Sequence, residues 1–323
     1  MSAVRDSPSR AVASRAAPAT TVPRRARVLF DEAHSEAWTI RPELADAMQP
    51  AHPRDSSYAL AAALLSEGDF IVEANADEEL GAERLGDVDV LVLAHPSDPA
   101  WERTTGVGSP RLSALELEAI ERFVRSGGGL IVLGETENDK YGNNLNELLA
   151  PYRLRLENET VQDYARHHLS TPSWVLGELT GGERGRGGDL LARVEAVCFY
   201  RATTIAVPGR ATVPGHATPP GRATVPGRAT VPGHATPPGH ATVPVRAASS
   251  ATSPGAPLMV AAEHGEGRVV VLADSDLFGD DCLDDLDHRE LWRNVAYWAG
   301  ARAFAGEGEP LRSAAAADPA WQR

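Results

Sequence analysis

Residues 127–135 read Gly-Gly-Gly-Leu-Ile-Val-Leu-Gly-Glu, and residues 269–276 read Val-Val-Val-Leu-Ala-Asp-Ser-Asp. Each segment is a continuous apolar run that ends in acidic residues. Apolar runs without polar alternation are typical of strands that are buried on both faces of a parallel sheet. The carboxyl ends of parallel strands meet at one edge of the sheet, where such folds bind ligands. We therefore expect the acids that follow the two runs to lie at that edge.

The remaining apolar segments supply further strands and helices in alternation. This alternation predicts an α/β fold, a doubly wound, flavodoxin-like, mostly parallel sheet with helices on both faces. Right-handed crossovers would place the carboxyl ends of all its parallel strands at one edge. The expected strands are 28–30, 70–73, 88–93, 130–133, 193–201, 258–262 and 268–272, and the expected helices are 56–66, 113–124, 143–149 and 289–298.

The helix after residue 112 carries the clearest local signals. Ser113 and Glu116 have the spacing of a capping box, in which each side chain satisfies a backbone N–H of the first turn. Three glycines at 127–129 end the helix. Its buried stripe is predicted to consist of Leu115, Ile120, Phe123 and Val124.

Composition divides the chain into a folded body, two tails and an insertion. Residues 211–246 are six tandem hexads such as Ala-Thr-Val-Pro-Gly-Arg, with almost no apolar surface to bury, which predicts a disordered or polyproline-like segment. The N-terminal tail mixes Ala, Ser, Pro and Arg without periodicity. We expect a disordered tail at 1–26, a body at 27–205 plus 257–301, a Pro/Gly repeat insertion at 206–256 and a flexible tail at 302–323.

Charge and composition exclude several classes of protein. The chain has 323 residues and a net charge of −14. Because the N-terminal tail and the repeats are basic, the folded body is more acidic still, and it would repel nucleic acid and anionic membranes. No apolar run is long enough for a membrane span, and no signal peptide is visible, so a cytoplasmic location is expected. The single lysine, Lys140, among many arginines is typical of a GC-rich bacterial genome.

Two polar clusters follow predicted strands. Asp31-Glu32-Ala33-His34 spells the DEAH string of helicases, but the chain lacks the GxxxxGK[ST] phosphate loop that a motor requires. Residues 135–144 hold three carboxylates, the lysine, a phenol and amides within ten positions, and polar loops at this edge commonly carry function. The candidate ligand-binding residues are Asp31, Glu32, His34, Glu135, Thr136, Glu137, Lys140, Tyr141, Asn143 and Asn144, together with Asp274, Ser275 and Asp276 after the late strand.

The late acidic segment contains seven aspartates within residues 274–287. It is not an EF-hand, because Phe278 occupies the fifth ligand position and a strand rather than a helix precedes it. Two interpretations stay open. Asp284, Asp285 and Asp287 could stabilise the positive end of the last helix, or a divalent cation could be held by the candidate metal ligands Asp31, Glu135 and Asp276.

Nucleophilic catalysis has little support in the sequence. There is no GxSxG elbow. Cys198 lies in a predicted strand, where a small buried side chain is the ordinary explanation. Cys282 lies among aspartates, which would raise the pKa of its thiol and reduce its reactivity.

The order of these elements resembles the class I glutamine amidotransferase-like superfamily. The shared features are a first strand ending in acids, the glycine-led strand Gly-Gly-Gly-Leu-Ile-Val-Leu-Gly-Glu, and the late strand Val-Val-Val-Leu-Ala-Asp-Ser-Asp before a final helix. The closest branch is the one that includes ThuA-like domains and auxiliary domains of ABC transport and gliding motility. The resemblance covers residues 27–205 and 257–301.

This resemblance implies that the chain lacks the catalytic groups of active amidotransferases. The position of the family's nucleophilic cysteine falls on Glu135 or Thr136, and its His-x-Glu pair falls on Asp274-Ser275-Asp276. Glutamine hydrolysis by that mechanism requires a thiolate and a base. A non-catalytic descendant or a site with different chemistry is therefore implied.

Three functions are compatible with the sequence. The first is a non-catalytic domain that binds a small polar ligand, such as a sugar, or a partner protein at the carboxyl edge of the sheet. The second is a metal-assisted hydrolase that uses Asp31, Glu135 and Asp276, and it requires these three carboxylates to converge. The third is an accessory domain of a larger, transport-type assembly, and it requires a large exposed apolar patch.

Overall fold

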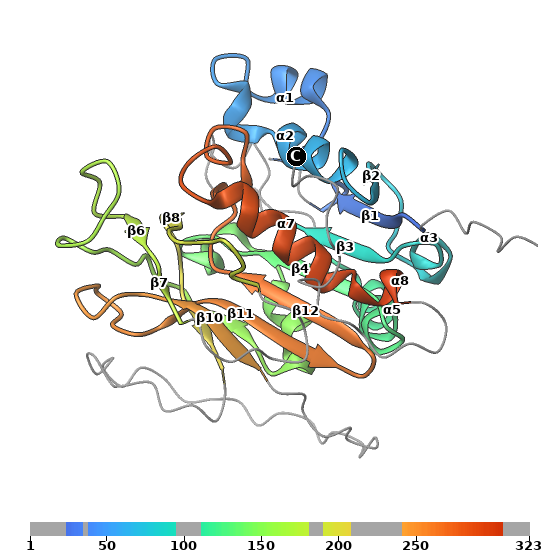
Figure 1. The fold of residues 1–323 in the computed structure, drawn as a ribbon. Helices are drawn as coiled ribbons and strands as arrows, with labels where there is room; N and C mark the ends of the chain where they lie inside the picture. Colours follow the sequence, from blue (N-terminus) through green and yellow to red (C-terminus); the bar gives the residue numbers. More distant parts are fainter. Residues whose placement is uncertain (1–23, 35–37, 95–110, 181–189, 208–240, 306–323) are drawn as a thin grey trace, which may run out of the picture.

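A computed structural model describes residues 24–34, 38–94, 111–180, 190–207 and 241–305. Its centre is an eight-stranded sheet in the order β2-β1-β3-β4-β12-β11-β10-β7 (Figure 1). The first five strands in this order pair in parallel, and the last three are antiparallel. The parallel part has the order of a flavodoxin-like fold, so the predicted fold class is confirmed.

The strands of the main sheet are short, and most of their residues are buried. Two small antiparallel sheets, β5-β9 and β6-β8, lie outside the main sheet. The strands are β1 Ala26–Asp31, β2 Phe70–Asn75, β3 Val90–Leu93, β4 Gly129–Leu133, β5 Arg155–Leu156, β6 Trp174–Leu176, β7 Glu178–Leu179, β8 Cys198–Tyr200, β9 Ile205–Ala206, β10 Thr242–Arg246, β11 Pro257–His264 and β12 Gly267–Leu272.

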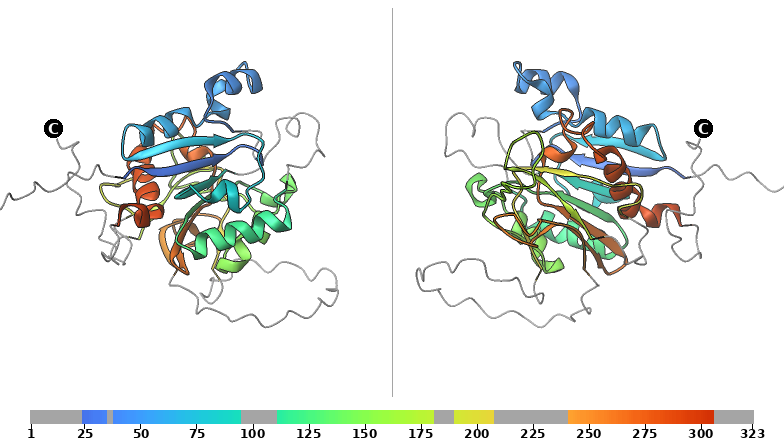
Figure 2. Two further views of the ribbon diagram at one scale, coloured as in Figure 1. Left: turned by 90° about the vertical axis from the view of Figure 1, so that its right-hand side faces the viewer. Right: turned by 60° about the vertical axis from the view of Figure 1, so that its left-hand side comes forward.

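Helices cover both faces of the sheet. Helix α7 packs against β4, β12 and α2, whereas α5 packs against β12 on the opposite face, beside α3 and α6 (Figure 2). The α-helices are α1 Pro42–Met48, α2 Ala59–Ser66, α3 Ala82–Leu85, α5 Ala114–Arg125, α6 Leu145–Leu149, α7 His288–Ala299 and α8 Ala301–Phe304, and the 3-10 helices are η1 Pro53–Ser56, η2 Asn138–Tyr141, η3 Ala150–Tyr152 and η4 Asp276–Phe278.

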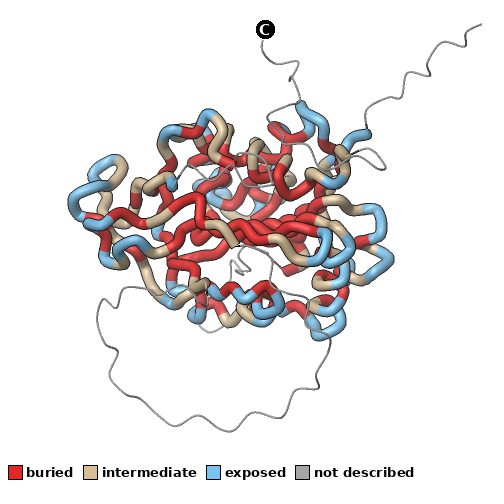
Figure 3. The backbone as a smooth tube through the Cα atoms, turned by 60° about the horizontal axis from the view of Figure 1, so that its bottom comes forward, coloured by how far each residue is buried: buried red, intermediate tan, exposed pale blue. Residues whose placement is uncertain are grey.

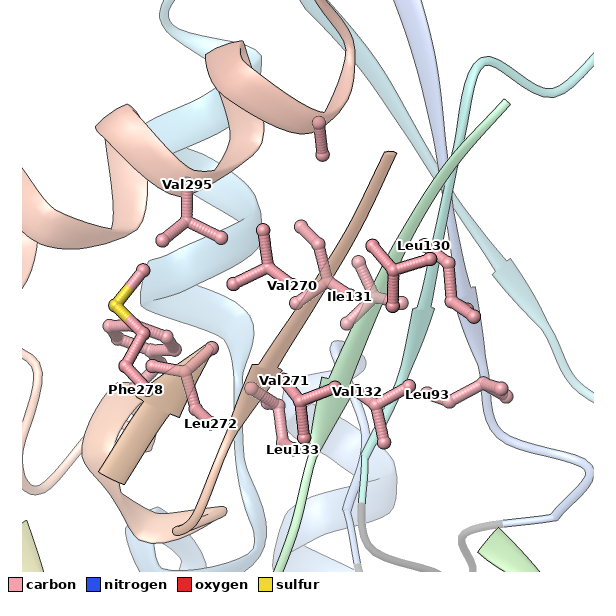
Figure 4. Close-up of a cluster of buried hydrophobic side chains, with 14 of the residues drawn as sticks. Leu93, Leu130, Ile131, Val132, Leu133, Val270, Val271, Leu272, Phe278 and Val295 are labelled. Atoms are coloured by element: carbon pink, nitrogen blue, oxygen red, sulfur yellow. The ribbon is translucent and has the colours of Figure 1, made fainter. Parts of the chain in front are cut away.

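The core forms around the central strands β3, β4 and β12, which are buried throughout (Figure 3). The side chains of Leu130–Leu133 in β4 and of Val269–Leu272 in β12 are apolar on both faces of the sheet, and Val270 lies beside Val295 of α7 (Figure 4). Because a continuous apolar strand can bury both faces only between two layers of helices, the sequence pattern and the observed layers agree.

Helix α5 confirms one local prediction and corrects another. Ser113 and Glu116 form the predicted capping box. Ile120 and Val124 are fully buried, but Leu115 is 73% exposed. Leu115 follows the capping residue by two positions, where the helix has only begun, and it points away from the sheet. The prediction that Leu115 is buried is therefore wrong.

The structure also moves a predicted boundary. The insertion was expected to run from 206 to 256, yet Thr242–Arg246 forms β10 and pairs with β11 inside the main sheet. Val243 and Val245 of this segment are buried in the sheet. Sequence reasoning missed this strand because its residues have almost the same composition as the preceding hexads. The chain thus rejoins the body by residue 241, and α8 continues the body to Phe304. The repeats at 211–240 and most of both predicted tails lie outside the described residues.

Leu130→Ala should lower the free energy of unfolding by about 2–5 kcal/mol, because it opens a cavity in the fully buried centre of β4. Leu115→Ala is the matched control and should change it by less than about 0.5 kcal/mol. Urea denaturation followed by circular dichroism measures both. Equal losses in the two variants would contradict the burial assigned to these side chains.

Candidate functional site

Three carboxyl groups converge where β4 and β12 end. The two strands pair in parallel with Leu133 opposite Leu272, so Glu135 and Asp274 both lie two residues beyond the last pair. One oxygen from each of Glu135, Asp274 and Asp276 lies within 4.8 Å of the others. We call these three residues the carboxyl cluster. Parallel pairing of the two strands thus brings together acids that are distant in sequence.

Hydrogen bonds fix the orientation of Glu135. The hydroxyl of Ser275 donates to Oε2 at 2.8 Å across 140 positions of sequence, and the N–H of Thr136 donates to Oε1 at 2.8 Å. The carbonyl of Ser275 in turn accepts from the phenol of Tyr58 at 2.7 Å. Tyr58 stacks on Trp38 with ring centroids 4.5 Å apart. The loop after β12 is therefore held from both sides.

The two aspartates of the carboxyl cluster have different environments. Asp274 is fully buried and accepts the backbone N–H groups of Tyr200 at 2.5 Å and of Asp276 at 3.0 Å. Asp276 is half-buried and forms an ion pair with Arg201, with Nη2 and Oδ2 3.2 Å apart. Arg201 follows β8, so the small β6-β8 sheet supplies a cation to the edge of the large sheet.

Burial and mutual repulsion hold protons on the carboxyl cluster. Removal from water, followed by the charge of Asp276, raises the pKa of Glu135 to about 8. The same two causes raise the pKa of Asp274. Burial, together with the charge of Asp276, raises the pKa of Asp281 to about 6. The cluster therefore contains a neutral carboxylic acid at pH 7, beside Asp276, which is paired with Arg201.

A second network occupies the end of β1. His34 Nδ1 lies 2.9 Å from Asp31 Oδ2, and His34 Nε2 lies 3.4 Å from Glu116 Oε1. Asn75 donates to the other oxygen of Asp31 at 2.9 Å. Burial alone would lower the pKa of His34, but the hydrogen bond and charge of Asp31, with those of Glu116, outweigh it and raise the pKa. This buried imidazole joins the end of β1 to the capping box of α5.

Glu32 organises the chain that follows β1. Its Oε1 accepts from Thr39 Oγ1 at 2.9 Å and from the N–H of Ile40 at 2.7 Å. Its Oε2 accepts from Arg41 through Nε and Nη2 at 3.0 and 2.7 Å. With both oxygens used in this way, Glu32 closes a loop rather than facing the carboxyl cluster.

The polar stretch from 136 to 144 makes mainly local contacts. Lys140 forms an ion pair with Glu137 at 2.9 Å and lies over the ring of Tyr141. Asn144 uses both ends of its amide to bind the backbone of Leu112. The remaining members also have partners: Asn143 bonds to Asn138 and to the N–H of Leu145, and Thr136 bonds to Thr160.

Two groups of candidate residues thus come together, and the other candidates bond to separate loop segments. Glu135, Asp274, Ser275 and Asp276 come together. Asp31 and His34 form the second network, since β3 separates β1 from β4. The requirement that Asp31 converge with Glu135 and Asp276 is not met among the described residues. Sequence reasoning missed Arg201, Tyr58 and Asp281; Arg201 lay in an expected strand, and nothing local linked it to Asp276.

The positions implied by the amidotransferase resemblance do meet in space. Glu135, one of the two residues that the resemblance aligns with the family's cysteine, accepts a hydrogen bond from Ser275, which lies in the segment that it aligns with the His-x-Glu pair. Within the described chain, the left-handed backbone of this loop falls at Glu137, with φ of 47°, and not at Glu135 or Thr136. The two segments therefore lie side by side and present carboxyl and hydroxyl groups to each other.

The fold and this site define the chain as a flavodoxin-like α/β domain with a carboxyl cluster at the carboxyl edge of its parallel sheet. Residues 82–296 match the family described as Domain of unknown function (DUF4350). The match covers more than half of the chain, and the chain belongs to this family. A comparison with curated proteins finds no significant match.

Two solved structures that align with TM-scores of 0.56 and 0.50 share this fold. The N-terminal domain of mmIFT52 aligns with a TM-score of 0.56 at 18% identity, covering 84% of this chain and 97% of that domain. The cytoplasmic protein STM1381 from Salmonella typhimurium LT2 aligns with a TM-score of 0.50 at 14% identity, covering 84% of this chain and 99% of that protein. A ThuA-like protein from Bacteroides uniformis aligns with a TM-score of 0.48 at 12% identity, covering 92% of this chain and 99% of that protein. At these identities the likeness concerns the fold. Among the described residues, no helix has the length and apolarity that crossing a bilayer needs.

Glu135→Gln should stabilise the protein at alkaline pH and leave it unchanged near pH 4. The pKa of Glu135 is about 8 in the fold against an ordinary value of 4.5. The folded state therefore holds an extra proton between these values, and wild-type stability falls as pH rises through that window. Glutamine does not undergo this loss, and since the difference between the two pKa values is about 3.5 units, the gain at pH 8.5 should approach about 4–5 kcal/mol.

Denaturation curves of both proteins from pH 4 to 9 measure this effect. Glu137→Gln, which changes an exposed glutamate two residues along the chain, is the control and should show no such gain. A constant difference between Glu135→Gln and wild type across the range would contradict the raised pKa.

His34→Gln should destabilise the protein most at acid pH. Because the pKa of His34 is raised above 6.5, its pairing with Asp31 and Glu116 contributes fully below that value and is lost as pH rises through the folded pKa. We expect a loss of about 1–3 kcal/mol at pH 6 that shrinks by pH 9. Thermal unfolding of this variant and of the exposed-site control His52→Gln distinguishes the network from a general effect of losing an imidazole.

Proposed function

We propose that this chain is a non-catalytic, amidotransferase-like binding domain that recognises a small polar ligand at the carboxyl cluster. The observation that carries the proposal is the convergence of Glu135, Asp274 and Asp276 within 4.8 Å at the ends of β4 and β12. Burying these carboxyl groups beside one another destabilises the fold. A ligand that forms hydrogen bonds with these carboxyl groups in the folded state would offset this cost and give a physical reason for their presence at the site.

The chemistry of the site matches a hydroxyl-bearing ligand. A neutral Glu135 can donate a hydrogen bond, Asp276 can accept one, and the guanidinium of Arg201 can donate several. A hydroxyl group both donates and accepts, so a polyhydroxylated molecule such as a sugar can use all three. This inventory also agrees with the ThuA-like resemblance of the sequence.

The environment of the two cysteines supports binding rather than amidotransfer. Burial raises the pKa of Cys198 and of Cys282, so neither thiol is available as a thiolate at neutral pH. The imidazole of His288 accepts the N–H of Cys198 and contacts the carbonyl of Cys282, and burial lowers its pKa to about 4. These groups pack the β6-β8 side of the domain and do not serve as a nucleophile and base.

A metal-assisted hydrolase is the second candidate, and the spacing of the carboxylate oxygens favours it. Oxygens within 4.8 Å of one another suit a hard divalent cation such as Mg²⁺ or Ca²⁺. Asp274 would take the role first expected for Asp31. Such an ion would polarise a bound substrate or activate a water molecule, while Ser275 and Thr136 orient Glu135.

A thermal-shift screen distinguishes the two candidates. Mono- and disaccharides, inositol, Mg²⁺, Ca²⁺ and Mn²⁺ are each tested, because a ligand of the folded state raises the melting temperature. We expect a rise with a polyhydroxylated compound and its loss in Asp276→Asn. Asp284→Asn is the matched control, since Asp284 is exposed on the same loop and pairs with Arg289 outside the cluster.

A rise with a metal ion alone, lost in Asp276→Asn, would support the hydrolase and overturn the non-catalytic proposal. No rise with any compound or ion would overturn both. An equal effect of Asp276→Asn and Asp284→Asn would show that the shift arises outside the carboxyl cluster.

A further inference from the structure

A cavity of about 660 Å³ lies at the end of the sheet opposite to the carboxyl cluster. Its lining includes Asp89, which directly precedes β3, and Gly128, which directly precedes β4. The five residues of β4 separate the two sites by roughly 16 Å. We call it the amino-edge cavity. It is formed between α3, α5 and α8, which lie together on one side of the molecule (Figure 1).

About half of the wall of the amino-edge cavity is apolar. Leu85, Val88, Ala119, Phe123 and Ala303 line it. A volume of this size is within the range of sites for small molecules, which combine apolar walls with a few polar groups. The walls therefore suit a ligand with an apolar body.

The charged residues of the lining are mostly positive. Among the described residues that line the cavity are three arginines, Arg24, Arg122 and Arg302, and one carboxylate, Asp89, whereas the whole chain carries a net charge of −14. The buried Arg268 adds a fourth cation near this end of the sheet, where its N–H bonds to the carbonyl of Gly128. Such local positive charge in an acidic protein favours an anion.

The partners of these arginines do not block an incoming anion. Arg24 pairs with Asp89 at 2.7 Å, Arg122 with Glu118 at 2.7 Å, and Arg302 with Glu266. All three arginine side chains are at least half exposed in these pairs, and exposed ion pairs contribute only about 0–1 kcal/mol. An anion in the cavity can therefore replace or share these partners.

The negative end of α5 points to this region, but its carbonyl groups are already bonded. The carbonyls of Arg122, Phe123 and Val124 accept from residues 126–128, and that of Arg125 accepts from Glu266. Because these carbonyls are satisfied, the end of the helix opposes an anion less than free carbonyl groups would.

Glycines keep the loop before β4 from filling the cavity. A Cβ at Gly127, where φ is 114°, would lie 2.6 Å from Arg302 Nε, and one at Gly128 would overlap the ring of Phe123, with Cε1 2.6 Å away. The side chains of Arg302 and Phe123 therefore lie directly against the backbone. This places a cationic group and an aromatic wall in the same cavity.

We propose that the amino-edge cavity is a second binding site, which takes a small organic anion with an apolar body. The body lies against Leu85 and Phe123, and the anionic group binds Arg122 and Arg302. This site is independent of the carboxyl cluster, because none of its residues belongs to it. Binding is strengthened at low ionic strength, since the arginines are exposed.

Isothermal titration calorimetry of the full chain with phenyl phosphate tests this proposal. Inorganic phosphate is the control probe that carries only the anionic group, and phenol is the one that carries only the aromatic ring. We expect saturable binding of phenyl phosphate and at least tenfold weaker binding of each half. Arg122→Gln with Arg302→Gln should weaken phenyl phosphate binding at least tenfold, and Ala303→Trp should weaken it by filling the cavity.

Arg125→Gln is the matched control, since Arg125 is an exposed arginine on α5 that pairs with Glu121 and does not line the cavity. The affinity of this variant for phenyl phosphate should stay within twofold of the wild-type affinity. Three results would overturn the proposal: no saturable binding, unchanged affinity in the double arginine variant, or equal weakening by Arg125→Gln. Melting temperatures of all variants confirm that each is folded.

Discussion

The parallel pairing of β4 with β12 is the constraint on which the rest of the structure depends. These strands are far apart in sequence, are buried on both faces, and join the parallel half of the sheet to its antiparallel half. The packing of helix α7 on these strands requires glycine at the entry to β4, because a Cβ on Gly129 would lie 2.5 Å from the carbonyl oxygen of Ala299 in that helix. Helix α7 can therefore lie close to the sheet, and both strands end at the same level.

The same pairing creates an electrostatic problem at the carboxyl edge. Glu135 and Asp274 leave the sheet side by side and repel each other in a buried setting. The domain meets this by keeping Glu135 protonated at neutral pH, by giving Asp274 two backbone N–H donors, and by bringing Arg201 from the β6-β8 sheet to Asp276. At the end of β1, repulsion between two carboxylates is offset by an imidazole instead, because His34 lies between Asp31 and Glu116. Each device is a tertiary arrangement of residues from separate elements.

Local patterns predicted the elements but not all of their surroundings. The capping box of Ser113 and Glu116 was visible because it depends on neighbours within one turn. The exposure of Leu115 was not, because an apolar side chain in the first turn fits either face. The hexad composition likewise concealed β10, whose burial depends on its pairing with β11.

The sequence by itself determined the α/β class, the positions of the central strands and the presence of acids after β1, β4 and β12. Each of these follows from where an apolar run lies in the sequence and which residues come directly after it. Only the tertiary structure decided which acids meet. Strand order places β3 between β1 and β4, so Asp31 joins His34, while adjacency of β4 and β12 unites Glu135 with Asp276. Strand order and the origin of Arg201 are set by packing between distant segments, and no local pattern of residues encodes them.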